Sequence, residues 1–178
     1  MDNKIVSLIN MKTPNKKPNI VTLRKENIAT IVNIAKPIWH QHYDPIIGVQ
    51  QVNYMLDKFQ SVQAMETQLT EGYRYFEVLD EEETVGYFSL QIRNKTHLFI
   101  SKFYLLEKTR GQGFGTAMLI FIENYAKKNN CQQLKLTVNR HNPAYQIYLK
   151  LGFVVYDSAQ VDIGSGYIMD DYLMSKNI

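Results

Sequence analysis

Three of the nine glycines in this chain lie within five residues, in the stretch Arg110-Gly111-Gln112-Gly113-Phe114-Gly115-Thr116. The apolar run before it predicts a strand over residues 98–106, and the apolar spacing after it, from Phe114 to Tyr125, predicts an amphipathic helix. A strand-loop-helix unit presents unpaired backbone N–H groups and the positive end of a helix dipole at one point. Glycines let a phosphate approach the backbone closely, so the stretch predicts an anion-binding loop.

Two familiar phosphate loops do not fit this stretch. A Walker loop ends in Gly-Lys-Ser/Thr, whereas this one ends in Phe114-Gly115-Thr116 without a lysine. A Rossmann fingerprint counted from Gly111 needs a glycine where Thr116 stands, and it belongs to an opening strand-helix-strand unit. The remaining pattern is Arg/Gln-x-x-Gly-x-Gly/Ala, matched by Arg110, Gly113 and Gly115. An ordinary loop whose glycines serve only the turn is the alternative.

Length and composition describe one globular domain. The chain has 178 residues, of which 45% are hydrophobic and 21% charged, close to the average for folded domains. Residues 1–18 contain four lysines and two prolines without sustained periodicity, so we expect a flexible or accessory leader there and a single domain over 19–178. No apolar run is long enough to span a membrane, and we expect no signal peptide and no membrane partner.

Charge and cysteine content narrow the function classes. A net charge of +3 without a clustered basic stripe argues against a nucleic-acid partner. The single cysteine, Cys131, excludes an internal disulfide framework and predicts a cytoplasmic protein with a buried thiol at that position.

Around the loop the apolar pattern predicts a helical first half and a strand-rich second half. A helix begins at residue 28, and Asp44-Pro45 predicts a loop before two further helices. An acidic turn joins strands 73–79 and 84–92, although it lacks the usual glycine. Further elements are strands 20–23, 134–138, 153–161 and 167–174 and a helix from Asn142-Pro143 to Gly152.

These elements and two further motifs resemble the GCN5-related N-acetyltransferase (GNAT) superfamily. Phe103-Tyr104-Leu105 is similar to the Leu-Tyr-Val strand of the family, and residues 144–153 are similar to its Ala-x-x-x-Tyr-x-Lys-x-Gly-Phe helix. The similarity covers residues 20–176. It implies an α/β (α+β) GNAT fold, a mixed seven-stranded central sheet flanked by helices, with acetyl-CoA held between two splayed parallel strands. The closing stretch from Asp162 and the Tyr54-Met55 region look similar to bacterial spermidine/spermine acetyltransferases.

The resemblance implies an activity and a set of ligand contacts. The activity is direct transfer of an acetyl group from acetyl-CoA to a primary amine in a ternary complex, without a metal. A small amine or polyamine is favoured and a peptide amine is the other acceptor; a non-catalytic acyl-CoA sensor is the rival function. A homodimer would pair through the last strand, 167–174. The implied contacts of acetyl-CoA are Phe103, Tyr104, Leu105, Arg110, Gly111, Gln112, Gly113, Phe114, Gly115, Thr116, Asn139, Asn142, Tyr145 and Tyr148.

The expected catalytic residues are Tyr148 and Ser101. Tyr148 stands where the family has its general acid, although its helix position also suits a core side chain. Relatives often carry a glutamate where this chain has Phe99 or Ser101, so Ser101 is expected to hold a water chain, with His97 as the other proton carrier considered.

One further departure concerns the arm of coenzyme A, and a separate expectation concerns the amine. His141 replaces an asparagine that contacts the pantetheine arm, and Asn139 or Asn142 is expected to substitute for it. We expect the amine to enter over the early helices, with His40 and His42 at a solvated helix end rather than on a metal. The other residues expected there are Trp39, Tyr43, Asp44 and Tyr54.

Overall fold

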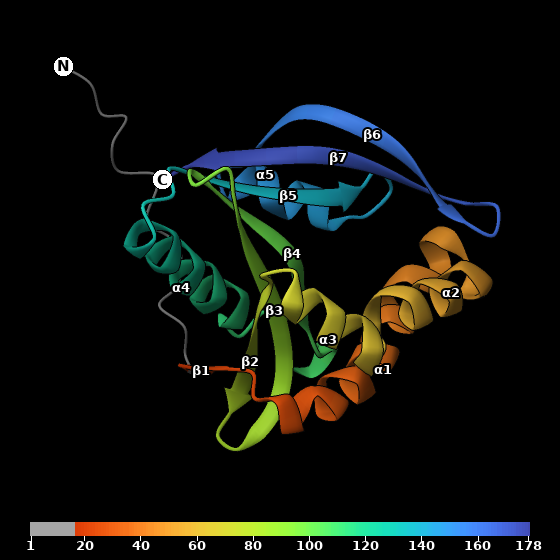
Figure 1. The fold of residues 1–178 in the computed structure, drawn as a ribbon, viewed down its shortest axis with the longest axis horizontal. Helices are drawn as coiled ribbons and strands as arrows, with labels where there is room; N and C mark the ends of the chain where they lie inside the picture. Colours follow the sequence, from red (N-terminus) through yellow and green to blue (C-terminus); the bar gives the residue numbers. More distant parts are fainter. Residues whose placement is uncertain (1–16) are drawn as a thin grey trace.

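The computed structural model describes residues 17–178, which form a seven-stranded sheet with helices on both faces (Figure 1). Most of the leader expected at residues 1–18 lies outside the described residues. The elements are β1 (Asn19–Thr22), α1 (Ile28–Ile47), α2 (Val49–Gln60), α3 (Val62–Thr70), β2 (Arg74–Asp80), β3 (Glu83–Arg93), β4 (His97–Leu105), α4 (Phe114–Lys128), β5 (Gln133–Asn139), α5 (Ala144–Lys150), β6 (Val154–Gly164) and β7 (Tyr167–Asn177).

The sheet opens at its centre. Its strand order is β1-β2-β3-β4-β5-β7-β6, and β4 and β5 form the parallel pair. They pair only from His97 opposite Gln133 to Ile100 opposite Leu136, although β4 continues to Leu105 and β5 to Asn139. Figure 1 shows the two strands starting side by side and then diverging. The expected mixed sheet with a splayed parallel pair is confirmed.

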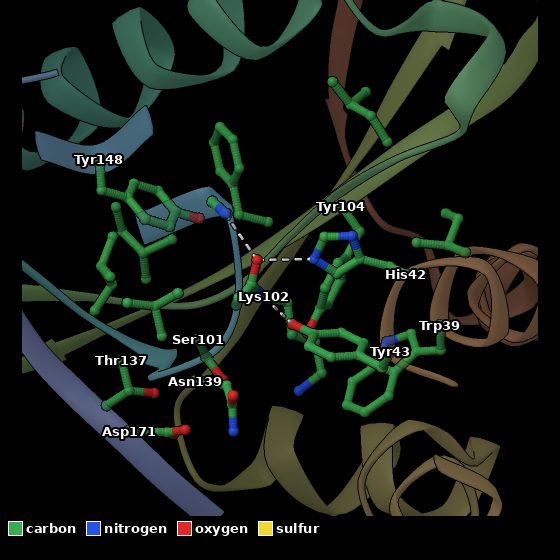
Figure 2. A pocket seen from close by; sticks show the side chains of 18 of the residues that line it. Trp39, His42, Tyr43, Ser101, Lys102, Tyr104, Thr137, Asn139, Tyr148 and Asp171 are labelled. Carbon is green, nitrogen blue, oxygen red and sulfur yellow. Dashed lines mark hydrogen bonds between the residues drawn. The ribbon is translucent and has the colours of Figure 1, made fainter. Parts of the chain in front are cut away.

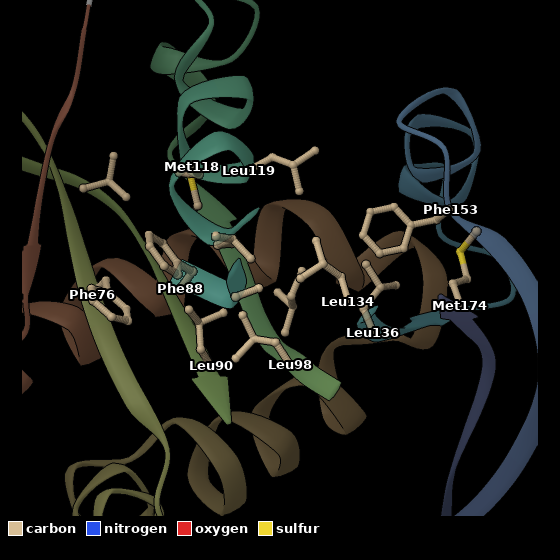
Figure 3. Close-up of a cluster of buried hydrophobic side chains, with 14 of the residues drawn as sticks. Phe76, Phe88, Leu90, Leu98, Met118, Leu119, Leu134, Leu136, Phe153 and Met174 are labelled. Carbon is tan, nitrogen blue, oxygen red and sulfur yellow. The ribbon is translucent and has the colours of Figure 1, made fainter. Parts of the chain in front are cut away.

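Two hydrophobic clusters lie on opposite faces of the sheet. The first packs α4 and α5 against β2, β3, β4, β5 and β7 and includes the aromatic and aliphatic side chains drawn in Figure 3. The second packs α1, α2 and α3 against β2 and β3. Burial of each large apolar side chain contributes about 1.5–3 kcal/mol, so both layers are fixed to the sheet. Figure 3 labels Phe76, Phe88, Leu90, Leu98, Met118, Leu119, Leu134, Leu136, Phe153 and Met174.

A β-bulge in β4 changes which side chains face α1 to α3. Leu90 of β3 pairs with Ile100, but Ser89 pairs with Lys102, so Ser101 has no partner across from β3. Before the bulge Ile100 packs in the α4 layer. After it Tyr104 packs in the α1–α3 layer, and Lys102 shares that side because side chains alternate along a strand.

Helix α1 corrects the expected loop at Asp44-Pro45. The helix continues to Ile47 with Pro37 and Pro45 inside it, and it ends at Gly48, whose φ is +82°. The backbone N–H of Gly48 donates to the carbonyl of Asp44 at 3.0 Å. A positive φ favours glycine, so the stop signal is Gly48 and not the proline before it.

The turns at Glu81 and in the β6–β7 hairpin agree with the predictions from the sequence. The acidic turn between β2 and β3 is a two-residue hairpin turn in which Glu81 adopts φ +58° in place of the missing glycine. The β6–β7 turn uses positive φ at Gly164, Ser165 and Gly166. Both hairpins are therefore confirmed.

The last strand is not an edge of the sheet. β7 pairs with β5 on one side and β6 on the other, so β6 and β1 are the edges and the expected pairing of two chains through β7 is wrong. Within residues 17–178 no helix is both long and apolar enough to cross a bilayer.

Candidate active site

A cavity of about 1510 Å³ lies where β4 and β5 diverge. Its wall is formed by α1, α2 and α3, the second half of β4, the glycine loop, β5, α5 and the β6–β7 hairpin. The chain thus brings segments more than a hundred residues apart to one space, and its two ends differ in character. The glycine loop forms one end, and the early helices with the hairpin form the other.

The glycine loop has the geometry that an anion cradle needs. Gly111 and Gly113 adopt φ of +74° and +91°, and both line the cavity with Arg110 and Gly115. A Cβ built on Gly111 would meet no atom of the described part of the chain within 4 Å, so the space beside its backbone is open there. The loop leads directly into α4, a helix of 15 residues, whose first N–H groups have no intrahelical acceptor. The chain therefore fits a pyrophosphate at this end.

Most of the expected acetyl-CoA contacts line the cavity, and two do not. Phe114 is only 1% exposed and lies in the α4 core, one helical turn from Met118. Tyr145 does not line the cavity, and its ring packs on Tyr172, with ring centroids 4.9 Å apart. Those two side chains are therefore removed from the expected set. The side chains or backbones that do line it are Phe103, Tyr104, Leu105, Arg110, Gly111, Gln112, Gly113, Gly115, Thr116, Asn139, Asn142 and Tyr148.

Tyr148 lies on the cavity side of α5. Its ring packs between Phe103 and Phe153, with centroid distances of 6.5 and 5.7 Å. Burial, followed by the nearby Tyr43, raises the pKa of Tyr148 well above its usual value. The phenol is therefore protonated at neutral pH, in the form that can donate a proton or a hydrogen bond.

Asn142 joins the start of α5 to α1. Its Oδ1 accepts from the backbone N–H of Ala144 at 2.8 Å and lies 2.9 Å from Nε2 of His42. Because the Ala144 N–H requires an oxygen there, the hydrogen of the second bond belongs to His42 Nε2. Burial lowers the pKa of His42, which favours the neutral ring.

The sequence predicted that His42 lies at a solvated helix end, and this prediction is wrong. It lines the cavity, whereas His40 pairs with Asp44 and both lie outside the wall. The helical spacing contained the signal, because His42 follows the buried Ile38 by four residues. Trp39 and Tyr43 also line the cavity and pack on one another at 4.9 Å, while Tyr54 does not reach the wall.

A polar group faces the cavity from the other side, where β5 and β7 run together. Asp171 of β7 lies opposite Asn139 of β5, and Figure 2 shows both near Thr137 and Ser101. Asp171 is 9% exposed, and burial raises its pKa to about 6, against the effect of a hydrogen bond with Thr137.

The sequence reasoning missed Asp171. The other two cavity-lining carboxylates of residues 17–178, Glu71 and Asp162, are exposed. Ser101 lines the cavity as expected, but His97, at the start of β4, does not.

The β6–β7 hairpin closes the end of the cavity opposite the glycine loop. The carbonyl of Ile163 accepts hydrogen bonds from Tyr54 Oη and Lys58 Nζ, both at 2.5 Å, and Gln51 Nε2 donates to the carbonyl of Ile168 at 3.0 Å. These bonds attach the hairpin to α2, and Figure 1 shows the tip of the two strands beside that helix. Strands and helices far apart in the chain thus enclose one chamber.

An open parallel strand pair, a glycine loop at a helix start and a protonated tyrosine beside them define the acyl-CoA-dependent acetyltransferases as the class of this protein. Residues 44–169 match the family model described as an acetyltransferase (GNAT) domain, so the chain belongs to the GNAT family. No curated protein sequence matches the chain.

Solved structures with the same fold agree with this membership. The PaiA N-acetyltransferase from Thermoplasma acidophilum in complex with coenzyme A has a TM-score of 0.76 at 20% identity, over 90% of this chain and 99% of that one. A GNAT family acetyltransferase from Elizabethkingia anophelis with acetyl-CoA bound scores 0.61 at 17% identity, over 91% and 99%. The ribosomal-protein-S18-alanine N-acetyltransferase from Escherichia coli scores 0.65 at 17% identity, over 90% and 94%.

Proposed function

We propose that this GNAT enzyme transfers the acetyl group of acetyl-CoA to a primary amine of a small molecule, directly and within a ternary complex. The observation that carries the proposal is the single cavity that joins the glycine loop to a buried carboxylate, Asp171, with Tyr148 in the same wall. Acetyl-CoA, when bound, supplies an acetyl group already activated as a thioester. The residues of the chain then bind, orient and move protons.

The glycine loop and the second half of β4 would hold the cosubstrate. Backbone N–H groups of the loop and the side chain of Arg110 suit the pyrophosphate. Beyond Ile100 the edge of β4 that faces β5 has no strand partner among residues 17–178, so its backbone groups near Phe103 and Leu105 are available to the amide groups of the pantetheine arm. Because β4 is held in the sheet, its position then sets the position of the thioester.

Asp171 and Tyr148 suit the two proton transfers. A carboxyl whose pKa is about 6 is mostly ionised at neutral pH, so Asp171 can take a proton from the acceptor ammonium, directly or through a water held by Ser101. The protonated phenol of Tyr148 can donate to the leaving thiolate. Ser101 is not a carboxylate and cannot itself be the base. Asp171 of β7 supplies the base that β4, the strand before the loop, lacks.

Direct transfer is favoured over a covalent acetyl-enzyme. Cys131 is 4% exposed and does not line the cavity, and burial raises the pKa of its thiol, which disfavours the thiolate. A buried thiol is what the sequence predicted for this position. The amine must therefore meet the thioester itself.

The experiment that tests the proposal is an amine panel assayed for release of free coenzyme A. Polyamines, amino acids, aminoglycosides and peptides are each offered with acetyl-CoA to the wild type and to Tyr148→Phe. We expect turnover of a small amine by the wild type and a large loss in the variant, with affinity for coenzyme A unchanged. Binding of acetyl-CoA without turnover of any amine would instead identify an acyl-CoA sensor.

A further inference from the structure

The wall of the cavity contains a buried lysine as well as a buried carboxylate. Lys102 of β4 is 5% exposed and lines the same cavity as Asp171. Figure 2 shows the two on different strands around this space. They do not form an ion pair with one another, and no salt bridge joins Lys102 to any carboxylate of residues 17–178. A basic and an acidic side chain are thus buried in one chamber and held apart.

The surroundings of Lys102 leave its amine incompletely satisfied. Its Nζ donates to Oε1 of Gln68 at 2.7 Å, and that oxygen also accepts from the hydroxyl of Tyr75. The rings of Tyr75 and Tyr73 lie 5.3 and 6.0 Å from Nζ. Gln68 is its only hydrogen-bond partner in the described part of the chain, whereas an ammonium has three donors. Glu71, which follows α3, also lines the cavity, but its side chain is exposed.

Packing alone does not explain a lysine here. A buried charge without a counter-charge is costly, and burial lowers the pKa of Lys102 to about 7. A methionine or leucine would fill a similar volume on the α1–α3 face of β4 without that cost. The bulge at Ser101 turns Lys102 toward the amine end of the cavity instead of the α4 core. A counter-ion that enters with a ligand would complete the site.

We infer that the acceptor amine also carries an anionic group, which Lys102 binds while the amine faces Asp171. The inference rests on the proposed function, because it assigns the amine to the same chamber. A carboxylate, phosphate or phosphonate provides the required chemistry: negative oxygens that accept from the two unused donors of the ammonium. A free polyamine does not, because a second ammonium would meet Lys102 as a like charge in a water-poor site. Lys102 thereby selects zwitterionic acceptors over purely cationic ones.

The test uses product analogues, so that binding is measured without turnover. N-acetyl α- and ω-amino acids of increasing chain length, each beside its uncharged carboxamide, are titrated calorimetrically into the enzyme saturated with coenzyme A. The wild type should bind the best acid roughly ten- to a hundredfold more tightly than its amide, the range expected for a hydrogen bond to a charged group. In Lys102→Met that ratio should fall to about one.

The control variant is Lys58→Met, which removes an exposed ammonium that also lines the cavity and donates to Ile163. It should retain the preference for the acid. Coenzyme A affinity and the melting temperature confirm that Lys102→Met is folded. Proton uptake is a second readout: at pH 8 the wild type should take up a proton when the acid binds, because the anion stabilises the ammonium of Lys102, and the Met variant should not.

The outcomes separate this inference from the proposed function. Equal affinity of the wild type for acids and amides, no binding of any acid in the series, or a preference that survives in Lys102→Met would overturn the anion site. Turnover of a polyamine together with equal affinities would sink the anion site and leave the acetyltransferase intact. Selective binding of acids with no turnover of any amine would do the reverse.

Discussion

Nε2 of His42 lies 2.9 Å from Oδ1 of Asn142, a contact that joins α1 to the start of α5 across a hundred residues of sequence. The same oxygen accepts from the backbone N–H of Ala144, so one amide both caps α5 and fixes the tautomer of the histidine. Because α5 carries Tyr148, the contact also sets the position of the proposed acid relative to the amine end of the cavity.

Asn142→Ala should therefore destabilise the protein and impair the site together. Loss of the capping bond costs about 1 kcal/mol, which lowers the melting temperature by about 2–4 °C in a chain of this size. Asn142→Asp keeps an acceptor for Ala144 and places a negative charge beside His42, so it should retain the melting temperature and raise the pKa of His42. Thermal unfolding and NMR titration of His42 measure the two effects. A pKa of His42 unchanged in the Asp variant would contradict the contact.

The glycine loop offers a test with an internal control. Gly111 has φ of +74° and open space beside it, so Gly111→Ala adds backbone strain and a methyl group where the pyrophosphate is expected. Affinity for coenzyme A should fall at least tenfold, together with a loss of stability of about 1 kcal/mol. Gly72 has φ of +90°, equally open space and no place in the cavity wall. Gly72→Ala should show a similar stability loss and an unchanged dissociation constant in calorimetry, and a matching loss of affinity would refute the assignment of the loop.

The glycine loop and its strand and helix could be read from sequence because all of their determinants are local. Lys102 could not be placed in that way. Strict alternation along β4 would put it on the same face as Ile100, in the α4 core, and only the bulge at Ser101 moves it to the cavity. Asp171 was missed for a different reason. The place of Asp171 in the cavity wall depends on β7 lying beside β5, with Asn139 opposite Asp171. These two residues are 32 positions apart in the chain, and no local pattern encodes their pairing.

The pH profile tests Asp171 as the proton acceptor. Its raised pKa of about 6 means that the active, ionised form is lost as the pH falls through that value. In the wild type kcat/KM should therefore rise as the pH increases from 5 to about 7. Asp171→Asn should lower kcat by roughly 10²- to 10⁴-fold and remove that rise.

Asp162→Asn serves as the matched control for Asp171→Asn. Asp162 also lines the cavity but is exposed, and an asparagine oxygen can still accept the backbone N–H of Gly164. Its profile should keep the rise between pH 5 and 7. A rise that persists in Asp171→Asn, or disappears in Asp162→Asn, would assign the base elsewhere.

Lys102 makes a prediction about stability that requires no substrate. Its pKa is lowered by burial from the ordinary value of 10.5 to about 7, so between these values the unfolded chain binds a proton that the folded chain does not. The stability of the wild type therefore contains a penalty that is complete below pH 7 and is relieved as the pH rises toward 10.5, by up to about 1.4 kcal/mol per pH unit.

Lys102→Met has no such group. The variant should be more stable than the wild type at pH 6, and the difference should shrink steadily at pH 8 and 9.5 in urea denaturation. Lys58→Met, which removes an exposed lysine from the same cavity, is measured beside it at the three pH values as the comparison. A pH-independent difference between wild type and Lys102→Met would mean that the amine is not desolvated in the folded protein, and it would remove the physical reason for a counter-ion in the cavity.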